Sequence, residues 1–288
     1  MESWTSLGME MGRVWWRAIA SPFFIALYAG IFLLTGWSYS RRSPRAERRK
    51  TVGQAFLSVL TGLCGGFLGS ALLLVAGIDV RNIGILSLWL ISLLLALIHP
   101  RLICFSYAGG LLSLYYQMTA PPAGCVPQII GLIAILHLIE SFLILVDGST
   151  QPGRVNIARE GQTVPGFRLQ RFWPLLLVMA CTADPGFGKT MPVGWPLLKC
   201  LPTDQCGSSY VLLPVLAILG YGETAACATP RLTVLRSASN LGLYSLILLA
   251  LALGAAAFPW LNWLAAIFAP LGHEAVIWLG RRAQSRSA

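Results

Sequence analysis

Long apolar stretches recur along nearly the whole chain, and they constrain its fold more than any other feature. Most run for about 17–25 residues, the length that a helix rising about 1.5 Å per residue needs to cross a hydrocarbon layer of about 30 Å. The sequence therefore predicts an all-α fold, a polytopic transmembrane bundle of about eight or nine helices that forms one domain over residues 1–288. The candidate spans are Ile19–Tyr39, Val52–Ile78, Ile83–Ile98, Leu102–Met118, Val126–Val146, Phe172–Thr182, Tyr210–Ala228, Leu241–Phe258 and Trp260–Gly280.

The composition excludes an ordinary water-soluble domain. Hydrophobic residues make up 56% of the chain and charged residues 11%, whereas soluble domains are about 45–50% apolar. A cleaved signal peptide is also excluded, because Ile19–Tyr39 is too long for the apolar part of a signal and is followed by a basic cluster. We therefore interpret Ile19–Tyr39 as a retained first span.

Three segments leave the number of spans open. Phe172–Thr182 is short enough to be a re-entrant or tilted half-span, and His99-Pro100-Arg101 is either a loop or a kinked break inside one hairpin. The count also changes if Met9–Ala20 lies along the membrane interface as an amphipathic segment. The side on which the N-terminus lies depends on these alternatives.

The net charge of +10 falls almost entirely on one side of the predicted bundle if the spans alternate. That side receives a short basic tail at 281–288 and a basic loop after the first span. The basic loop contains Arg41, Arg42, Arg45, Arg48, Arg49 and Lys50. The positive-inside rule predicts that this side and the C-terminus are cytoplasmic, with the basic loops in contact with anionic lipid or partner proteins. No basic module typical of nucleic-acid binding is present.

Five ionisable residues fall inside or at the ends of predicted spans. They are His137, Glu140, Glu223, His273 and Glu274. Each costs at least a few kcal/mol in hydrocarbon unless it faces protein or water. His137 and Glu140 are three residues apart and therefore share one helix face. One hypothesis is a metal site or a proton relay built from these residues. The other is hydrogen bonding between helices by paired or protonated groups near the ends of spans.

Small residues form two interleaved patterns on Val52–Ile78. Gly62 pairs with Gly66, and Gly65 pairs with Gly69, four residues apart in each case. Small faces let helix backbones approach closely where lipid offers no hydrophobic drive for association. The pattern favours close packing within the bundle or between protomers, with the lining of a conduit as the alternative.

Two cysteines stand apart from the others. Cys200 and Cys206 flank a short loop on the predicted outer side, where an oxidising exterior permits a disulfide, and Cys125 is a third candidate. We interpret the cysteines in or beside spans, including Cys104, as small apolar residues.

No pattern of catalytic residues supports an enzyme. His273-Glu274 resembles the start of the zinc-protease pattern, but Ile277 stands where that pattern requires its second histidine. No Ser-His-Asp arrangement or dinucleotide fingerprint stands out. The sequence therefore predicts a non-enzymatic protein without a cofactor.

Several short patterns resemble the membrane region of MinJ-like proteins, which are multi-pass proteins of Gram-positive bacteria with a cytoplasmic PDZ domain after the last span. These patterns are the basic run Arg41–Lys50, His99-Pro100-Arg101, Val146-Asp147-Gly148, Arg171-Phe172-Trp173-Pro174, Leu219–Glu223 and Ala269–Ile277. The resemblance covers nearly all of the chain. It departs from the family after the His-Glu segment, because this sequence stops at Ala288 and lacks the peptide-binding edge that a PDZ domain supplies.

Three functions are compatible with these features. The resemblance implies a non-enzymatic membrane scaffold for cell-division or polarity proteins. The alternative is a transporter of a small molecule or ion that uses the intramembrane histidines and glutamates. The third is a membrane-embedded, metal-dependent enzyme. A fold that brings the five ionisable residues together around a cavity would favour transport or catalysis, and their dispersal would favour the scaffold.

Overall fold

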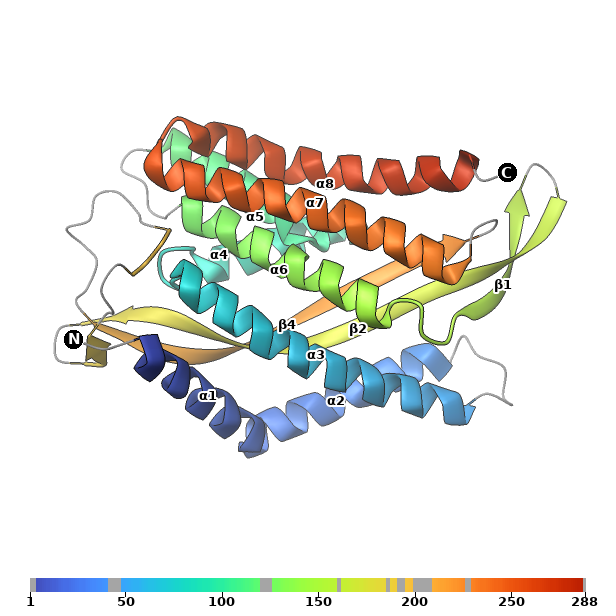
Figure 1. Cartoon of the computed structure of the whole chain (residues 1–288), viewed down its shortest axis with the longest axis horizontal. Helices are drawn as coiled ribbons and strands as arrows, with labels where there is room; N and C mark the ends of the chain where they lie inside the picture. Colours follow the sequence, from blue (N-terminus) through green and yellow to red (C-terminus); the bar gives the residue numbers. More distant parts are fainter. Residues whose placement is uncertain are drawn as a thin grey trace.

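The computed structural model describes residues 4–40, 48–119, 126–159, 162–184, 187–190, 195–198, 209–225 and 229–286. Helices dominate this part of the chain, and a small antiparallel sheet runs between them (Figure 1). The elements in chain order are α1 (Trp4–Ala20), α2 (Pro22–Ser40), α3 (Arg48–Ala76), α4 (Ile85–Ile98), the 3₁₀ helix η2 (Pro100–Ile103), α5 (Phe105–Met118), α6 (Val126–Asp147), β1 (Gly153–Arg159), β2 (Gln162–Ala183), β3 (Lys189–Thr190), β4 (Ser209–Ala225), α7 (Pro230–Ala257) and α8 (Leu261–Arg286).

Four of the described helices, α3, α6, α7 and α8, are long and apolar enough to cross a membrane. A fifth crossing is available if α1 and α2, which meet at a bend of 67°, count as one broken span. The prediction of a membrane-type helical chain agrees with this finding. The prediction of an all-α bundle with about eight or nine helical spans is wrong, because two predicted spans are strands and two are short helices.

The candidate spans Phe172–Thr182 and Tyr210–Ala228 lie largely in β2 and β4, which pair antiparallel from Phe167↔Ala225 to Ala183↔Ser209. The larger rise per residue of a strand explains how so short an apolar segment can be as long as a hydrocarbon layer is thick. The run Phe172–Thr182 extends about 36 Å as a strand at about 3.3 Å per residue, but only about 17 Å as a helix. The sheet has the order β1-β2-β4-β3, and Figure 1 shows β2 and β4 running through the length of the bundle.

Side chains of α1 and α3 and the segment after α3 bind the edge of β2 that β4 leaves free. An uncovered strand edge would expose unsatisfied backbone groups, which is costly where water is excluded. The contacts are Trp15 Nε1 to Leu176 O (3.0 Å), Val178 N to Ser70 Oγ (2.8 Å), Thr182 N to Asp79 Oδ2 (3.1 Å) and Val80 N to Ala180 O (2.9 Å). These bonds explain how a strand is tolerated among apolar helices.

The glycines of α3 allow that helix to lie directly on β2. A Cβ added at Gly66 would lie 2.5 Å from Leu176 O and 2.7 Å from Leu176 N, and one at Gly62 would meet the backbone of Pro174. Gly65 and Gly69 face side chains of α6 and β2, among them Leu143 and Leu177. The small-residue face therefore contacts a strand and α6.

A buried ion pair joins the end of α6 to β2. Asp147 and Arg171 are each 1% exposed, and Arg171 Nη2 lies 3.3 Å from Asp147 Oδ1. Trp173 Nε1 donates to Asp147 Oδ2 at 2.9 Å, and Arg171 Nε donates to the Asp147 carbonyl at 3.2 Å. This corner fixes where the central helix meets the sheet.

Helices α4 and α5 form a short hairpin. Each has 14 residues, or about 21 Å, which is less than a hydrocarbon layer of about 30 Å. The hairpin begins after the end of α3 and returns to the start of α6, which lie at the same end of the molecule (Figure 1). Its tip, around His99 and η2, contacts the middle of α8, as described below. The break at His99-Pro100-Arg101 is therefore a turn within a hairpin.

Candidate functional site

Three side chains from distant segments meet at the tip of the hairpin. Cys104 precedes α5, His137 lies near the middle of α6, and His273 lies near the middle of α8. Cys104 Sγ is 3.2 Å from His137 Nε2 and 3.5 Å from His273 Nε2. One ligand atom from each residue lies within 4.8 Å of the other two. We call Cys104, His137 and His273 the thiol–imidazole cluster.

The second nitrogen of each imidazole is held by an oxygen acceptor. His137 Nδ1 lies 2.8 Å from Ile133 O, which can only accept a hydrogen bond. His273 Nδ1 lies 3.2 Å from the Tyr107 hydroxyl, which donates its own proton to Glu274 Oε1. Both Nδ1 atoms therefore carry the ring proton, and both Nε2 atoms present a lone pair towards Cys104.

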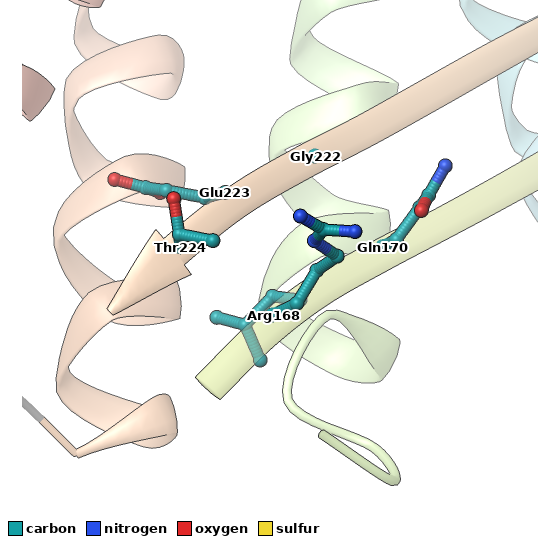
Figure 2. A pocket seen from close by; sticks show the side chains of 6 residues that line it. Arg168, Gln170, Gly222, Glu223 and Thr224 are labelled. Carbon is teal, nitrogen blue, oxygen red and sulfur yellow. The ribbon is translucent and has the colours of Figure 1, made fainter. Parts of the chain in front are cut away.

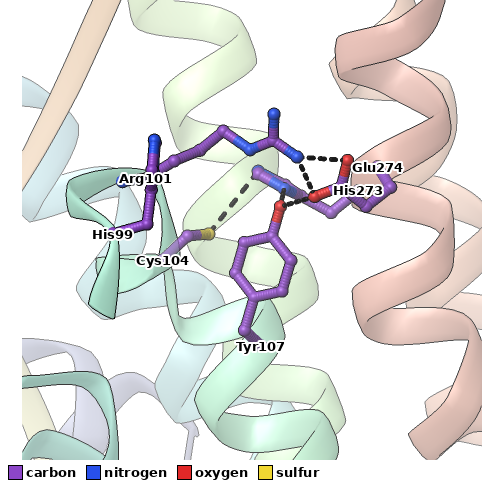
Figure 3. A network of polar contacts seen from close by, with 6 residues as sticks. All are labelled: His99, Arg101, Cys104, Tyr107, His273 and Glu274. Carbon is purple, nitrogen blue, oxygen red and sulfur yellow. Dashed lines mark hydrogen bonds and ion pairs between the residues drawn. The ribbon is translucent and has the colours of Figure 1, made fainter. Parts of the chain in front are cut away.

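A second network fixes the hairpin tip on α8 (Figure 3). The Arg101 guanidinium pairs with both carboxylate oxygens of Glu274, and Tyr107 also binds that carboxylate. His99 Nδ1 accepts from the Arg101 backbone N–H at 3.1 Å, which caps η2. Glu274 thus positions Tyr107, and Tyr107 in turn orients His273.

A cavity of about 550 Å³, lined by both polar and apolar residues, adjoins the cluster between η2, α6, β4, α7 and α8. His273 contributes to both the cavity wall and the cluster. The other ionisable or polar residues of the wall are Arg101, Glu140, Tyr221, Glu223, Thr224, Ser237, Asn240 and Arg281. The cavity therefore combines both signs of charge with hydroxyl and amide groups.

Glu223 links the cavity to the open end of the β2–β4 ladder. It accepts hydrogen bonds from the Tyr221 hydroxyl at 2.9 Å and from Ser237 on α7. Figure 2 shows its side chain pointing towards α7, on the other side of β4 from Arg168 and Gln170. A second pocket of about 330 Å³ lies over these residues. Glu223 therefore borders both pockets.

All five ionisable residues that the sequence singled out lie in this region. His137 and His273 are in the cluster, Glu274 is bonded to Tyr107 beside it, and Glu140 and Glu223 line the cavity. Sequence reasoning missed Cys104, because a lone cysteine in an apolar segment looks like a small hydrophobic residue. Its position directly after the His99-Pro100-Arg101 break was the available signal.

Several predicted site residues fall where the structure says little. Arg41, Arg42, Arg45, Cys200 and Cys206 lie outside the described residues, so the basic loop and the disulfide stay predictions. Arg48, Arg49 and Lys50 begin α3, but their side chains are not described. The free cysteines of the described part are Cys64, Cys104 and Cys181.

Comparison with known proteins finds no family model, curated protein or solved structure that matches the chain. The fold and site therefore define a class only, a helical chain with four to five apolar helices able to cross a membrane. Its site is a thiol–imidazole cluster that lies beside a cavity lined by charged and polar side chains.

Proposed function

We propose that this protein is a membrane transporter for a small ion, the proton, with the 550 Å³ cavity as its internal site. The observation that supports the proposal is that ionisable residues from distant segments lie close together. Five ionisable residues from the middle of α6, the end of β4 and the middle of α8 lie around one cavity and its adjoining cluster. Residues that served only to join helices would not need to gather, and charges at membrane depth usually mark ion pathways.

The hairpin of α4 and α5 supports this proposal. Helices that end at the middle of a membrane bundle, with irregular backbone lining a cavity, are typical of transporter sites. Here α5 begins directly after Cys104, and Arg101 from the adjoining turn lines the cavity. The hairpin tip thus contributes to the wall of the cavity.

Charge supports an orientation for this transporter. The ends of α6 and α8, the start of α7 and the β1–β2 hairpin lie together at one end of the molecule (Figure 1). That end carries Arg154, Arg168, Arg231 and Arg281. By the positive-inside rule we assign this end and the C-terminus to the cytoplasm. The cavity, which includes Gly280 and Arg281 near the end of α8, then opens towards the cytoplasm.

Proton flux into liposomes tests the proposal. The purified chain is reconstituted with a pH-sensitive dye in the lumen, and a pH gradient is imposed with potassium and valinomycin present. We expect dye quenching faster than in empty liposomes, and slower quenching for Glu140→Gln and Glu223→Gln. Glu10→Gln is the matched control, because Glu10 lies on α1 and binds Arg13 and Lys189 away from the cavity. Equal flux in protein-containing and empty liposomes would reject the proposal.

A membrane scaffold is the second candidate. The observation that favours it is the β1–β2 hairpin, which extends beyond the helices at the basic end of the molecule (Figure 1). A projecting strand edge of this kind offers backbone groups to a partner protein. A fluorescent fusion expressed from the native locus tests this candidate. Uniform distribution, with no division or shape defect on deletion, would count against it.

A further inference from the structure

We propose that Cys104, His137 and His273 bind one divalent transition-metal ion, with Zn²⁺ as the best fit, and leave a fourth coordination position open. This site goes beyond the proposed transport function, because the cavity requires no metal for a proton pathway. It also stands if transport fails, since binding is measured without flux.

The distances match those of a tetrahedral zinc site. Bond lengths of about 2.3 Å for Zn–S and about 2.05 Å for Zn–N at a tetrahedral angle place sulfur and nitrogen about 3.6 Å apart. Cys104 Sγ lies 3.2 Å from one Nε2 atom and 3.5 Å from the other. Both sulfur–nitrogen distances therefore lie close to the tetrahedral value, and all three ligand atoms lie within 4.8 Å of one another.

Hydrogen-bond donors are scarce within the cluster. A thiol carries one proton, yet Cys104 Sγ faces the lone pairs of two Nε2 atoms. The Ser106 hydroxyl lies 3.2 Å from His137 Nε2, but it also lies 3.0 Å from the Tyr244 hydroxyl. Tyr244 donates its own proton to a backbone carbonyl at 2.7 Å, so the one proton of Ser106 can serve either Tyr244 or His137 Nε2, but not both. A cation between the three ligand atoms satisfies all of them at once.

The surroundings are those of a metal centre. Each histidine donates its Nδ1 proton to an oxygen, one to a backbone carbonyl and one to Tyr107, and such partners fix the orientation of a ligand ring. The ligand set of one thiolate and two imidazoles selects zinc and its neighbours over magnesium or calcium, which prefer oxygen. His137 is 4% exposed, so water competes weakly for that side of the site.

The open position distinguishes this site from a structural zinc site. Structural sites use four protein ligands, whereas three protein ligands leave room for water or another exchangeable group. His273 belongs to both the cluster and the cavity wall, so the cavity gives the ion a route to the site. The fourth position can therefore hold water or another small ligand that enters from the cavity.

Cobalt spectroscopy tests this inference on the full chain in lipid nanodiscs. The protein is stripped with a chelator and titrated with Co²⁺ without oxygen. We expect about one Co²⁺ per chain, with the visible bands of a tetrahedral site and a thiolate-to-cobalt charge-transfer band, both removed by Zn²⁺. Cys104→Ser should abolish the charge-transfer band. His273→Gln should abolish the tetrahedral bands.

Three further variants separate the site from folding defects and from other cysteines. Tyr107→Phe leaves the ligands in place but removes the acceptor for His273 Nδ1, and it should weaken Co²⁺ binding by about 10-fold or more. Cys64→Ser and Cys181→Ser are matched controls outside the cluster and should bind as the unaltered chain does. Absence of a tetrahedral band, or a charge-transfer band that survives Cys104→Ser, would overturn the inference.

Discussion

Replacing Asp147 with Asn removes the partner of a buried charge and should strongly destabilise the protein. Asp147 and Arg171 are each 1% exposed, so the guanidinium has little access to water. Asp147→Asn keeps the size of the side chain and an acceptor for Trp173 Nε1, which donates to Asp147 Oδ2 at 2.9 Å. The substitution therefore isolates the loss of charge.

The magnitude follows from the geometry of the pair. Opposite charges 3.3 Å apart attract by about 5 kcal/mol at an effective dielectric constant of about 20. Breaking one side of such a buried pair typically costs about 3–5 kcal/mol, because the remaining charge is uncompensated. Equilibrium unfolding in mixed micelles, with a denaturing detergent as the variable, measures this change. The exposed Arg154→Gln is a control that should change stability by less than about 0.5 kcal/mol.

The double variant Asp147→Asn with Arg171→Gln provides the critical comparison. Removing both charges should recover part of the lost stability, because no uncompensated charge remains. A loss below about 1 kcal/mol for Asp147→Asn would refute the reasoning. The reasoning would also be refuted if adding Arg171→Gln to Asp147→Asn lowered the stability by as much as Arg171→Gln does alone.

Three other outcomes follow from the structure. Gly66→Ala places a Cβ 2.5 Å from Leu176 O and should lower the free energy of unfolding by about 1–3 kcal/mol. Gly53→Ala, on the open side of α3, should not destabilise the protein, and the same unfolding assay compares the two variants. Ser70→Ala leaves the Val178 N–H unpaired and should cost about 1–3 kcal/mol, read as a lower melting temperature in detergent. Co²⁺ affinity should fall as pH decreases, because the thiol and imidazole ligands must lose protons to bind metal, and a titration at several pH values checks this.

The sequence predicts the long helices well. The candidate spans Val52–Ile78 and Val126–Val146 correspond to α3 and α6 within a few residues. Their length and unbroken apolar character fit a membrane-crossing helix and little else. The same reasoning fails at β2 and β4, because an apolar run by itself does not distinguish a buried strand from a buried helix. The shortness of Phe172–Thr182 and the prolines Pro174 and Pro214 were signals against a helix.

The site was only partly predictable for a different reason. His137 and His273 stand out because ionisable residues are costly in apolar segments. Their meeting with Cys104 depends on a hairpin tip that joins residues 33 and 169 positions apart. No local pattern encodes contacts of that range, so cluster formation follows only from the packing of α5, α6 and α8.

X-ray absorption spectroscopy of the zinc-loaded chain tests the central claim most directly, since it reports the atoms around the metal. The account predicts one sulfur at about 2.3 Å and two imidazole nitrogens at about 2.0–2.1 Å, with one further light atom at the open position. Loss of the sulfur contribution in Cys104→Ser would place the metal at the hairpin tip. A first shell of four sulfurs, or of oxygen atoms alone, would contradict the convergence of Cys104, His137 and His273 on one ion.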